Sequence, residues 1–181
     1  MAERYVALLR AINLAGKNAV GMADLRTMLG RLGMTDVTTL LMSGNAIFAS
    51  GTASPASLEK KFEAASAKTF GFATDYFIRD ARELEAVIGD NPFPKEASAD
   101  PGHLLVVFLK DAPTPAAVKA LQSAIKGREV LRAKGRHAYI YYPDGVGRSK
   151  LTAALIEKHL GCRGTARNWN TVQKLAAIVN D

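Results

Sequence analysis

RDARELEAV at residues 79–87 and RNWNTVQKL at residues 167–175 mark the same point in two halves of the chain. Arg79 and Arg167 each precede a polar residue that is suited to cap a helix. Apolar residues follow each arginine by five and by eight positions, a spacing that places them on one helical face. Gly71 and Gly161 also occupy matching positions ahead of the two stretches. We therefore interpret the chain as an internal duplication.

Outward from these stretches, each half shows the order strand, helix, strand, strand, helix, strand, helix. In the first half the pattern predicts strands at 5–11, 37–42, 46–49 and 74–78, and helices that begin near Met22, at a Ser54 cap and at an Asp80 cap. In the second half it predicts strands at 103–109, 129–133, 138–142 and 163–166, and helices capped by Thr114, Ser149 and Asn168. The expected fold class is α+β, with two tandem ferredoxin-like halves, each a βαββαβ core plus an extra helix.

The expected domain organisation follows from the same pattern. Residues 1–90 form a first α+β subdomain and residues 103–181 a second, basic one. The segment 91–102 contains Pro92, Pro94 and Pro101 and is the expected linker.

Composition limits the class of protein. The chain has 181 residues, 48% of them hydrophobic and 23% charged, which is typical of a globular protein. No apolar run approaches the roughly 20 residues needed to span a membrane, and the N-terminal MAERYVALLRAIN lacks a signal-peptide pattern. With Cys162 as the single cysteine, the expected location is the reducing cytoplasm. No metal-ligand spacing is present, and no cofactor is expected.

The positive charge is concentrated in the second half. Residues 1–90 contain ten Lys and Arg against ten Asp and Glu, whereas residues 91–181 contain fourteen against seven and so carry the whole net charge of +7. Such an asymmetry favours an anionic partner, although basic residues spread over a solvated surface would give the same count.

Two loops of the second half are candidates for holding an anion. In a ferredoxin-like half, the loop around GVGRSK (145–150) and the loop around RNWN (167–170) lie at one edge of the sheet, so two helix N-termini with unpaired amides would point to a common place. Arginine matches phosphate and carboxylate geometry, and Trp169 offers a stacking face. The candidate ligand-binding residues are Arg148, Ser149, Lys150, Arg167, Asn168, Trp169 and Asn170.

These residues also allow a purely structural interpretation. Ser149 and Asn168 can be plain helix caps, and Trp169 can belong to the core. The stretch is no P-loop, because Tyr142 stands where that motif requires its first glycine and Arg148 where it requires lysine. No catalytic group is evident from the sequence, and Glu59 and Glu63 resemble a solvated helix face.

The first half contains a secondary candidate site. The loop NLAGKN (13–18) and the turn SGN (43–45) would share one sheet edge, where glycines allow backbone amides to converge on an anion. The residues concerned are Asn13, Lys17, Asn18, Ser43 and Asn45. The alternative is an ordinary loop beside an ordinary hairpin turn.

Nucleic-acid binding is a second hypothesis. The basic residues lie in 126–167, and Tyr139, Tyr141 and Tyr142 lie on one expected strand, where aromatic rings could stack on bases. The RNA-recognition consensus is absent.

Two stretches, LLRAINLAGKNAVGMADLRTMLGRLGMTDVTTLLMSGNAIF (8–48) and GRSKL…TARNWNTVQKLA (147–176), resemble the bacterial family known as domain of unknown function 1697. The resemblance implies a soluble bacterial protein and supplies no activity, cofactor or catalytic residue. The family's usual pattern is closer to LLRGINVGGKN and TYLQSGN, so Ala11 and Ala15 replace glycines, and Leu40 and Met42 replace tyrosine and glutamine. The expected function is binding of a phosphate-bearing or other anionic small molecule in the second half, with an interaction module for nucleic acid or protein as the alternative. Whether the protein is an enzyme stays open.

Overall fold

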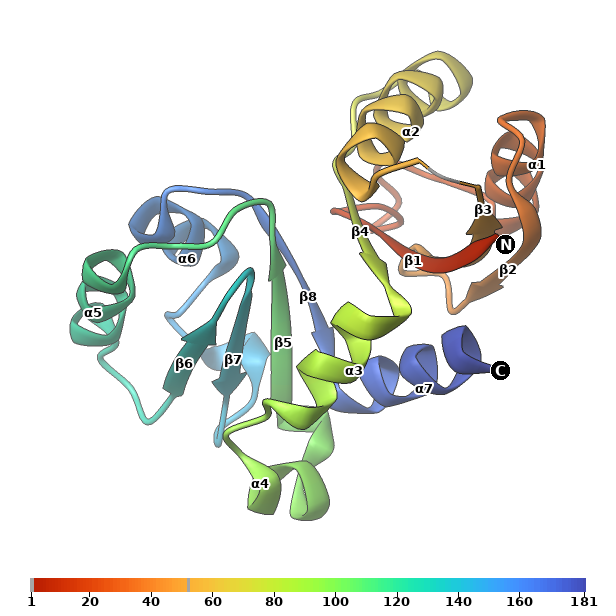
Figure 1. The fold of residues 1–181 in the computed structure, drawn as a ribbon. Helices are drawn as coiled ribbons and strands as arrows, with labels where there is room; N and C mark the ends of the chain where they lie inside the picture. The colour runs from red at the N-terminus through yellow and green to blue at the C-terminus, as the bar shows by residue number, and fades with distance from the viewer. Residues whose placement is uncertain (1, 52) are drawn as a thin grey trace. The chain divides into compact units, whose positions relative to one another are not determined.

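The computed structural model describes residues 2–51 and 53–181, which form an α+β fold with two four-stranded antiparallel sheets (Figure 1). The first sheet has the order β2-β3-β1-β4 and the second the order β6-β7-β5-β8. Their strands are β1 Glu3–Leu9, β2 Thr35–Leu40, β3 Asn45–Ser50, β4 Tyr76–Asp80, β5 Leu104–Leu109, β6 Val130–Lys134, β7 His137–Tyr141 and β8 Gly164–Asn168. When the four strands of each sheet are counted along the chain, both sheets have the order second, third, first, fourth.

Seven α-helices occur in the described ranges. They are α1 Met22–Arg31, α2 Pro55–Phe70, α3 Ala81–Gly89, α4 Pro94–Ala99, α5 Pro115–Ala124, α6 Ala153–Leu160 and α7 Trp169–Asn180. Two short 3-10 helices, η1 Pro101–His103 and η2 Val146–Arg148, precede β5 and α6. None of the helices in the described part of the chain is long and apolar enough to cross a membrane.

Caps and glycines set most helix boundaries where the sequence predicts them. The Ser54 and Thr114 side chains accept hydrogen bonds from the amides of Ser57 and Ala117 at the starts of α2 and α5. Asp80 and Asn168 accept from the third residue that follows each of them, at the starts of α3 and α7. The predicted cap at Ser149 is wrong. Thr152 caps α6 instead, because Ser149 is the C-cap residue of η2 and lies three residues before Thr152.

In the first unit, α1 and α2 cover one face of the sheet (Figure 1). Alternate residues along the strands, such as Tyr5, Ala7 and Leu9 on β1, join the core on that face, as the two-residue side-chain period of a strand requires. Phe48 packs edge-on against Phe62 of α2 with the ring centroids 5.3 Å apart. This core is mostly apolar, and its buried polar side chains include Ser66 of α2, whose hydroxyl is hydrogen-bonded to that of Tyr76 at 2.5 Å.

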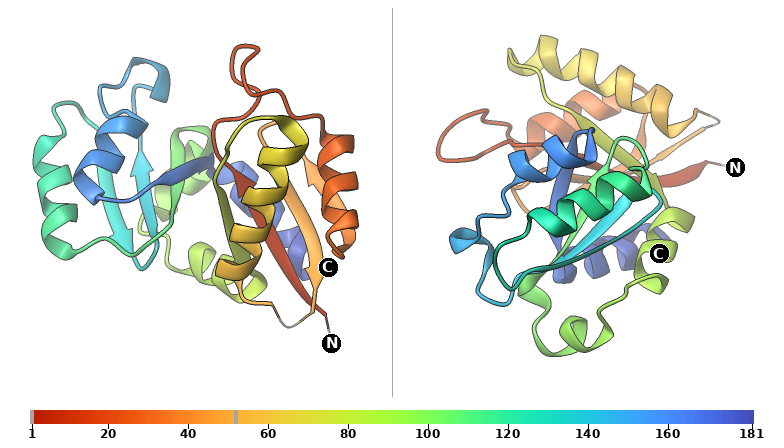
Figure 2. Two further views of the ribbon diagram at one scale, coloured as in Figure 1. Left: turned by 90° about the horizontal axis from the view of Figure 1, so that it is seen from above. Right: turned by 90° about the vertical axis from the view of Figure 1, so that its left-hand side faces the viewer.

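In the second unit, α5 and α6 lie side by side over one face of their sheet (Figure 2). Their apolar residues pack on Val107, Leu109, Ala138 and Ile140. The opposite face includes Tyr139, whose side chain is 1% exposed and donates a hydrogen bond to the carbonyl oxygen of Val87 at 2.8 Å.

The chain divides into two compact units. One unit comprises the residues up to Glu85 together with Leu175–Asp181, and the other comprises Ala86–Lys174. The segment 91–102, predicted as a linker, is part of the second unit and contains α4 and η1. Pro94 and Pro101 lie in the first turns of these two helices, positions that proline favours because its missing N–H is not needed there.

The outer strand β4 depends on carboxylates from α2. Glu63 accepts a hydrogen bond from the amide of Tyr76 at 3.0 Å, and Glu59 accepts one from the amide of Ile78 at 2.8 Å. Since α2 places residues four apart on one face, the two carboxylates reach alternate amides along the strand. The prediction that Glu59 and Glu63 form a solvated helix face is therefore wrong, because these side chains satisfy amides on the outer edge of β4, which pairs with no strand in the described residues.

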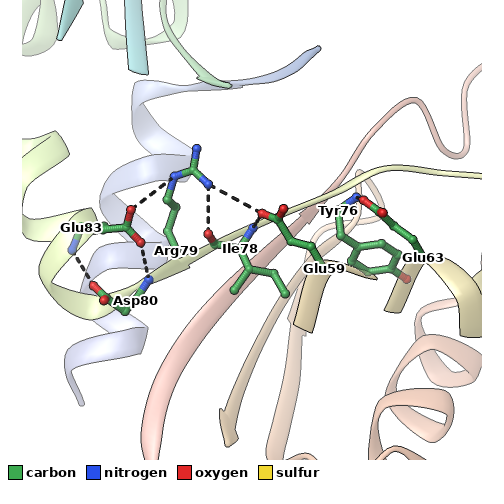
Figure 3. A network of polar contacts seen from close by, with 7 residues as sticks. All are labelled: Glu59, Glu63, Tyr76, Ile78, Arg79, Asp80 and Glu83. Carbon is green, nitrogen blue, oxygen red and sulfur yellow. Dashed lines mark hydrogen bonds and ion pairs between the residues drawn. The ribbon is translucent and has the colours of Figure 1, made fainter. Parts of the chain in front are cut away.

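Arg79 joins this network (Figure 3). Its side chain is 0% exposed and contacts the carboxylates of Glu59 at 3.9 Å and Glu83 at 4.0 Å. It also donates to the carbonyl oxygen of Ile78 at 3.0 Å. A buried guanidinium requires such acceptors, because burying an uncompensated charge costs several kcal/mol. Arg79 therefore connects α2, β4 and α3.

We expect Glu59→Ala to lower the free energy of unfolding by about 3 kcal/mol, because the substitution leaves the buried Arg79 guanidinium without one carboxylate and the Ile78 amide without its acceptor. Urea denaturation measures the loss. Glu85→Ala is the matched control, since Glu85 is exposed on α3 and the change should cost less than about 0.5 kcal/mol. Equal losses in the two variants would contradict the role given to Glu59.

Candidate functional site

The two loops of the second-half candidate site do leave the sheet at one edge. The register pairs Tyr141, at the end of β7, with Leu104, and Asn168, at the end of β8, with Leu105. Both strands are antiparallel to β5, so both end beside its first residues. The predicted juxtaposition of the loops therefore has a basis in the register of the sheet.

Arg167 is buried in the sheet. It lies opposite Val106 and is 8% exposed. Its guanidinium donates to the hydroxyl oxygen of Thr165 at 2.8 Å and to the carbonyl oxygen of Ala166 at 2.9 Å. Burial lowers the pKa of Arg167 to about 10, because desolvation disfavours the charged form. Its side chain thus contributes to the interior of the fold.

The rest of the RNWN stretch begins α7. Asn168 is exposed, and its side-chain oxygen accepts a hydrogen bond from the amide of Thr171 at 3.0 Å. Trp169 is 3% exposed and is part of the core, whereas Asn170 is exposed. Of these residues, Asn168 and Asn170 are accessible to a ligand.

The GRSK stretch is more open. Arg148 and Lys150 are exposed, and Ser149 is half-buried. The Ser149 hydroxyl donates to the Glu129 carboxylate and accepts from the amide of Leu151. These two bonds fix the path of the chain into α6 and leave the charged side chains on either side of Ser149 at the surface.

A cavity of about 360 Å³ adjoins Lys150. It lies between the end of α5 and the start of α6, and its lining is mostly apolar. The lining residues are Ala124, Ile125, Lys126, Gly127, Glu129, Lys150, Leu151 and Leu155. A space of this size is within the range of small-molecule sites, which are typically hydrophobic with a few charged groups. The sequence motif indicates Lys150 as a site residue but gives no sign of Lys126, because only the packing of α5 against α6 brings the two lysines to one cavity.

Glu129 is the acidic member of this lining. Its carboxylate lies so close to Gly127 that a Cβ at that position would be 2.3 Å from a carboxylate oxygen. Gly127 therefore allows the carboxylate to approach the backbone, and the bond from Ser149 holds it there. The lining of the cavity thus includes two cationic side chains and one anionic side chain.

In the first half, the loop after β1 and the turn after β2 are in contact. Asn13 donates to the carbonyl oxygens of Val20 at 3.0 Å and Met42 at 2.7 Å, and its own carbonyl accepts from the Val20 amide at 2.8 Å. The amide of Leu9 donates to the carbonyl oxygen of Gly44 at 2.9 Å. The loop and the turn therefore share one edge, as the strand pattern predicts.

The polar residues of this edge hold its backbone together. Asn18 donates to the carbonyl oxygen of Ala11 at 3.2 Å, and the buried Asn45 donates to the Ser43 hydroxyl at 3.0 Å. Lys17 is exposed. Among the secondary candidate residues, Lys17 is thus the one whose charged side chain lies at the surface, while the asparagines build the loop.

The same loop, which projects from the end of the first sheet in Figure 2, adopts a left-handed backbone at several positions. Ala11 has φ 51°, Asn13 53°, Ala15 48° and Asn18 51°. Asparagine tolerates this region, but alanine does so at a cost of about 1 kcal/mol or more. The two alanines therefore store strain in a short loop.

A family model described as a protein of unknown function (DUF1697) matches residues 2–139. The chain belongs to this family. A solved structure of a conserved bacterial protein from Streptococcus pneumoniae, SP0830, is 26% identical, covers 99% of each chain and has a TM-score of 0.76. No curated protein matches. The DUF1697 match ends at residue 139, before the GRSK and RNWN stretches, whereas the structural likeness includes both.

The two strained alanines stand where the resemblance implies glycine, since the structure has positive φ at both Ala11 and Ala15. Glycine adopts this region without a steric penalty. In this DUF1697 protein, alanine occupies a backbone conformation that suits glycine.

We expect Ala11→Gly and Ala15→Gly each to raise the free energy of unfolding by about 0.5–1 kcal/mol, because relief of the left-handed strain exceeds the added entropy of the unfolded chain. Ala120→Gly, at an exposed helical position of α5, is the control of opposite sign and should lower that free energy by about 1 kcal/mol. Thermal unfolding with a matched denaturant series measures all three. Destabilisation by both loop substitutions would refute the strain.

Proposed function

We propose that this protein binds a small amphipathic anion, such as a phosphate or carboxylate attached to an apolar group, in the cavity of the second unit. The observation that supports this proposal is the placement of Lys126 and Lys150 on one hollow whose other walls include Ile125, Leu151 and Leu155. The lysines would hold the anionic group and the apolar walls would hold the remainder of the ligand.

The charge of the second half supports the same ligand class. The whole net charge of +7 resides in residues 91–181, so an anion approaching this half meets an attractive field. Arg148 is exposed and adds to that positive field. Asn168 and Asn170 are accessible at the same sheet edge. Lysine binds anions as a compact point charge, which suits a ligand whose headgroup stays partly hydrated.

Lysine side chains are better candidates for binding the anion than the N-termini of α6 and α7. Thr152 and Asn168 cap α6 and α7, so part of each first turn already has an acceptor. Arg167 and Trp169 are buried. The anion would therefore bind Lys126 and Lys150 and not the N-termini of α6 and α7. The RNWN stretch would be mainly structural.

The alternative, an interaction module for nucleic acid or protein on the basic half, has less support. Tyr139 and Tyr142 are buried, and Tyr142 donates to the carbonyl oxygen of Leu151 at 3.1 Å. Base stacking needs exposed aromatic faces, and only Tyr141 of this strand is half-exposed. Binding to single-stranded RNA that falls steeply with added salt would favour this alternative.

We also propose that each half has the ferredoxin-like arrangement, in a protein that works in the cytoplasm. The βαββαβ order and the repeated strand order support the first statement. The single Cys162, which has no second cysteine in the chain to pair with, supports the second.

The proposal predicts that octyl phosphate binds more tightly than inorganic phosphate and that Lys126→Ala/Lys150→Ala weakens its binding at least tenfold, because two favourable charge contacts are lost. Isothermal titration at low ionic strength measures both constants. Lys119→Ala/Lys158→Ala is the matched control, because it removes the same charge from exposed sites on α5 and α6 and spares the lining. Equal weakening in the two double variants, or no binding by the unaltered protein, would refute the site.

A second substitution tests the sign of the field in the cavity. Glu129→Gln keeps the acceptor for the Ser149 hydroxyl and removes a negative charge from the lining. We expect octyl phosphate to bind roughly two- to fivefold more tightly, because a like charge near the headgroup is lost. The same titration measures the gain, and unchanged or weaker binding would place the phosphate away from Glu129.

A further inference from the structure

Three polar side chains meet at the start of β5 in the second unit, and none of the three lines the cavity. Asp100 follows α4, His103 ends η1, and Tyr141 ends β7. The sheet brings them together, because its register pairs Tyr141 with Leu104, the residue after His103. Nothing in the order of these residues along the sequence indicates the cluster.

Asp100 is the centre of the cluster. One of its carboxylate oxygens lies 2.9 Å from Nδ1 of His103 and accepts a hydrogen bond from the Tyr141 hydroxyl at 3.0 Å. A carboxylate can only accept, so Nδ1 carries the proton of the neutral imidazole and Nε2 carries a lone pair. The hydrogen bond to Asp100 also raises the pKa of Tyr141, and the phenol, which is protonated at neutral pH even without this shift, donates to that oxygen.

Nε2 of His103 faces a glycine. A Cβ at Gly145 would lie 3.7 Å from Nε2, in van der Waals contact. Gly145 has φ 83°, a conformation that side chains disfavour, and its amide donates to the carbonyl oxygen of Tyr142. The Tyr142 amide in turn donates to the carbonyl oxygen of His103 at 2.9 Å. The loop is thus fixed beside the ring without a side chain over Nε2, and the His103 side chain is 44% exposed.

We propose that His103 is the nucleophile of a second site, which accepts the acyl group of an activated ester. The Nε2 lone pair forms a bond to the carbonyl carbon, and the bond from that carbon to the ester oxygen breaks. The oxygen leaves with the electron pair. Water then attacks the same carbon and gives up one proton to the ester oxygen that left, the N–C bond breaks, and the lone pair returns to Nε2 as the carboxylic acid departs.

Asp100 and Tyr141 are positioning residues in this site. The Asp100 carboxylate selects the tautomer with the lone pair on Nε2 and offsets the positive charge of the acylated ring, as a carboxylate does for a catalytic histidine elsewhere. Tyr141 holds that carboxylate in place. The exposed ion pair of Arg128 with Asp144 borders the cluster. The positive charge of Arg128 acts against the effect of Asp100, because it lowers the pKa of Tyr141.

The test is the release of p-nitrophenolate from p-nitrophenyl acetate by the full-length protein. His103→Ala is expected to remove at least four-fifths of the rate above buffer. His159→Ala, which deletes a partly exposed histidine of α6, is the matched control and should leave the rate unchanged. Equal rates for the two variants, or no rate above buffer for the unaltered protein, would overturn the proposal.

A second measurement uses the unaltered chain and needs no variant to fold. Diethyl pyrocarbonate transfers an ethoxycarbonyl group to an imidazole nitrogen, and mass spectrometry of the peptides follows each histidine. We expect His103 to react at least fivefold faster than His159, and long-range ¹H–¹⁵N spectra to show its proton on Nδ1. Asp100→Asn should lower the reactivity of His103 to that of His159 and remove the preference of the proton for Nδ1. The far-ultraviolet circular dichroism should stay unchanged. Equal reactivity of the two histidines, or a proton on Nε2, would count against the site.

Discussion

The buried guanidinium of Arg79 is the constraint on which the first unit depends. Its charge is stable in the interior only because Glu59 and Glu83 approach from two helices, and this requirement fixes α2 and α3 against β4. Arg167 occupies the corresponding place in the second unit, opposite Val106 as Arg79 is opposite Val6. Both guanidinium groups also donate to the carbonyl oxygen of the preceding residue. The two halves thus share a polar feature of the interior as well as an order of strands.

The cationic side chains of the second unit are either buried in the fold or exposed to a ligand. Arg167 is buried, which lowers its pKa to about 10, and the neighbouring Asn168 caps α7. Lys126 and Lys150 lie at the surface beside an apolar hollow. An anion held there would interact with flexible ammonium groups, so its affinity would depend on ionic strength more than that of an anion held by fixed backbone amides.

The second unit also illustrates how a sheet assembles chemistry from short segments. Asp100 lies in the segment 91–102, His103 follows it directly before β5, and Tyr141 lies at the end of a hairpin. Antiparallel pairing of β5 with β7 brings these ends together, and Gly145 keeps the adjoining loop free of a side chain next to the imidazole. The first unit differs, because its strained loop lies at the other end of its sheet, after β1, where asparagine side chains hold it closed.

The sequence by itself determined the α+β class, the repeated order of elements, most helix caps and the DUF1697 membership, because these depend on local period, local hydrogen bonds and residues adjacent along the chain. It also indicated that Gly-Arg-Ser-Lys lies in a basic, glycine-bearing loop. Only the tertiary structure decided that Ser149 does not cap α6, that Glu59 and Glu63 satisfy an edge strand, and that Lys126 lies beside Lys150. Such facts depend on which side chains meet when helices pack on a sheet, and burial and contact between distant segments have no local signature.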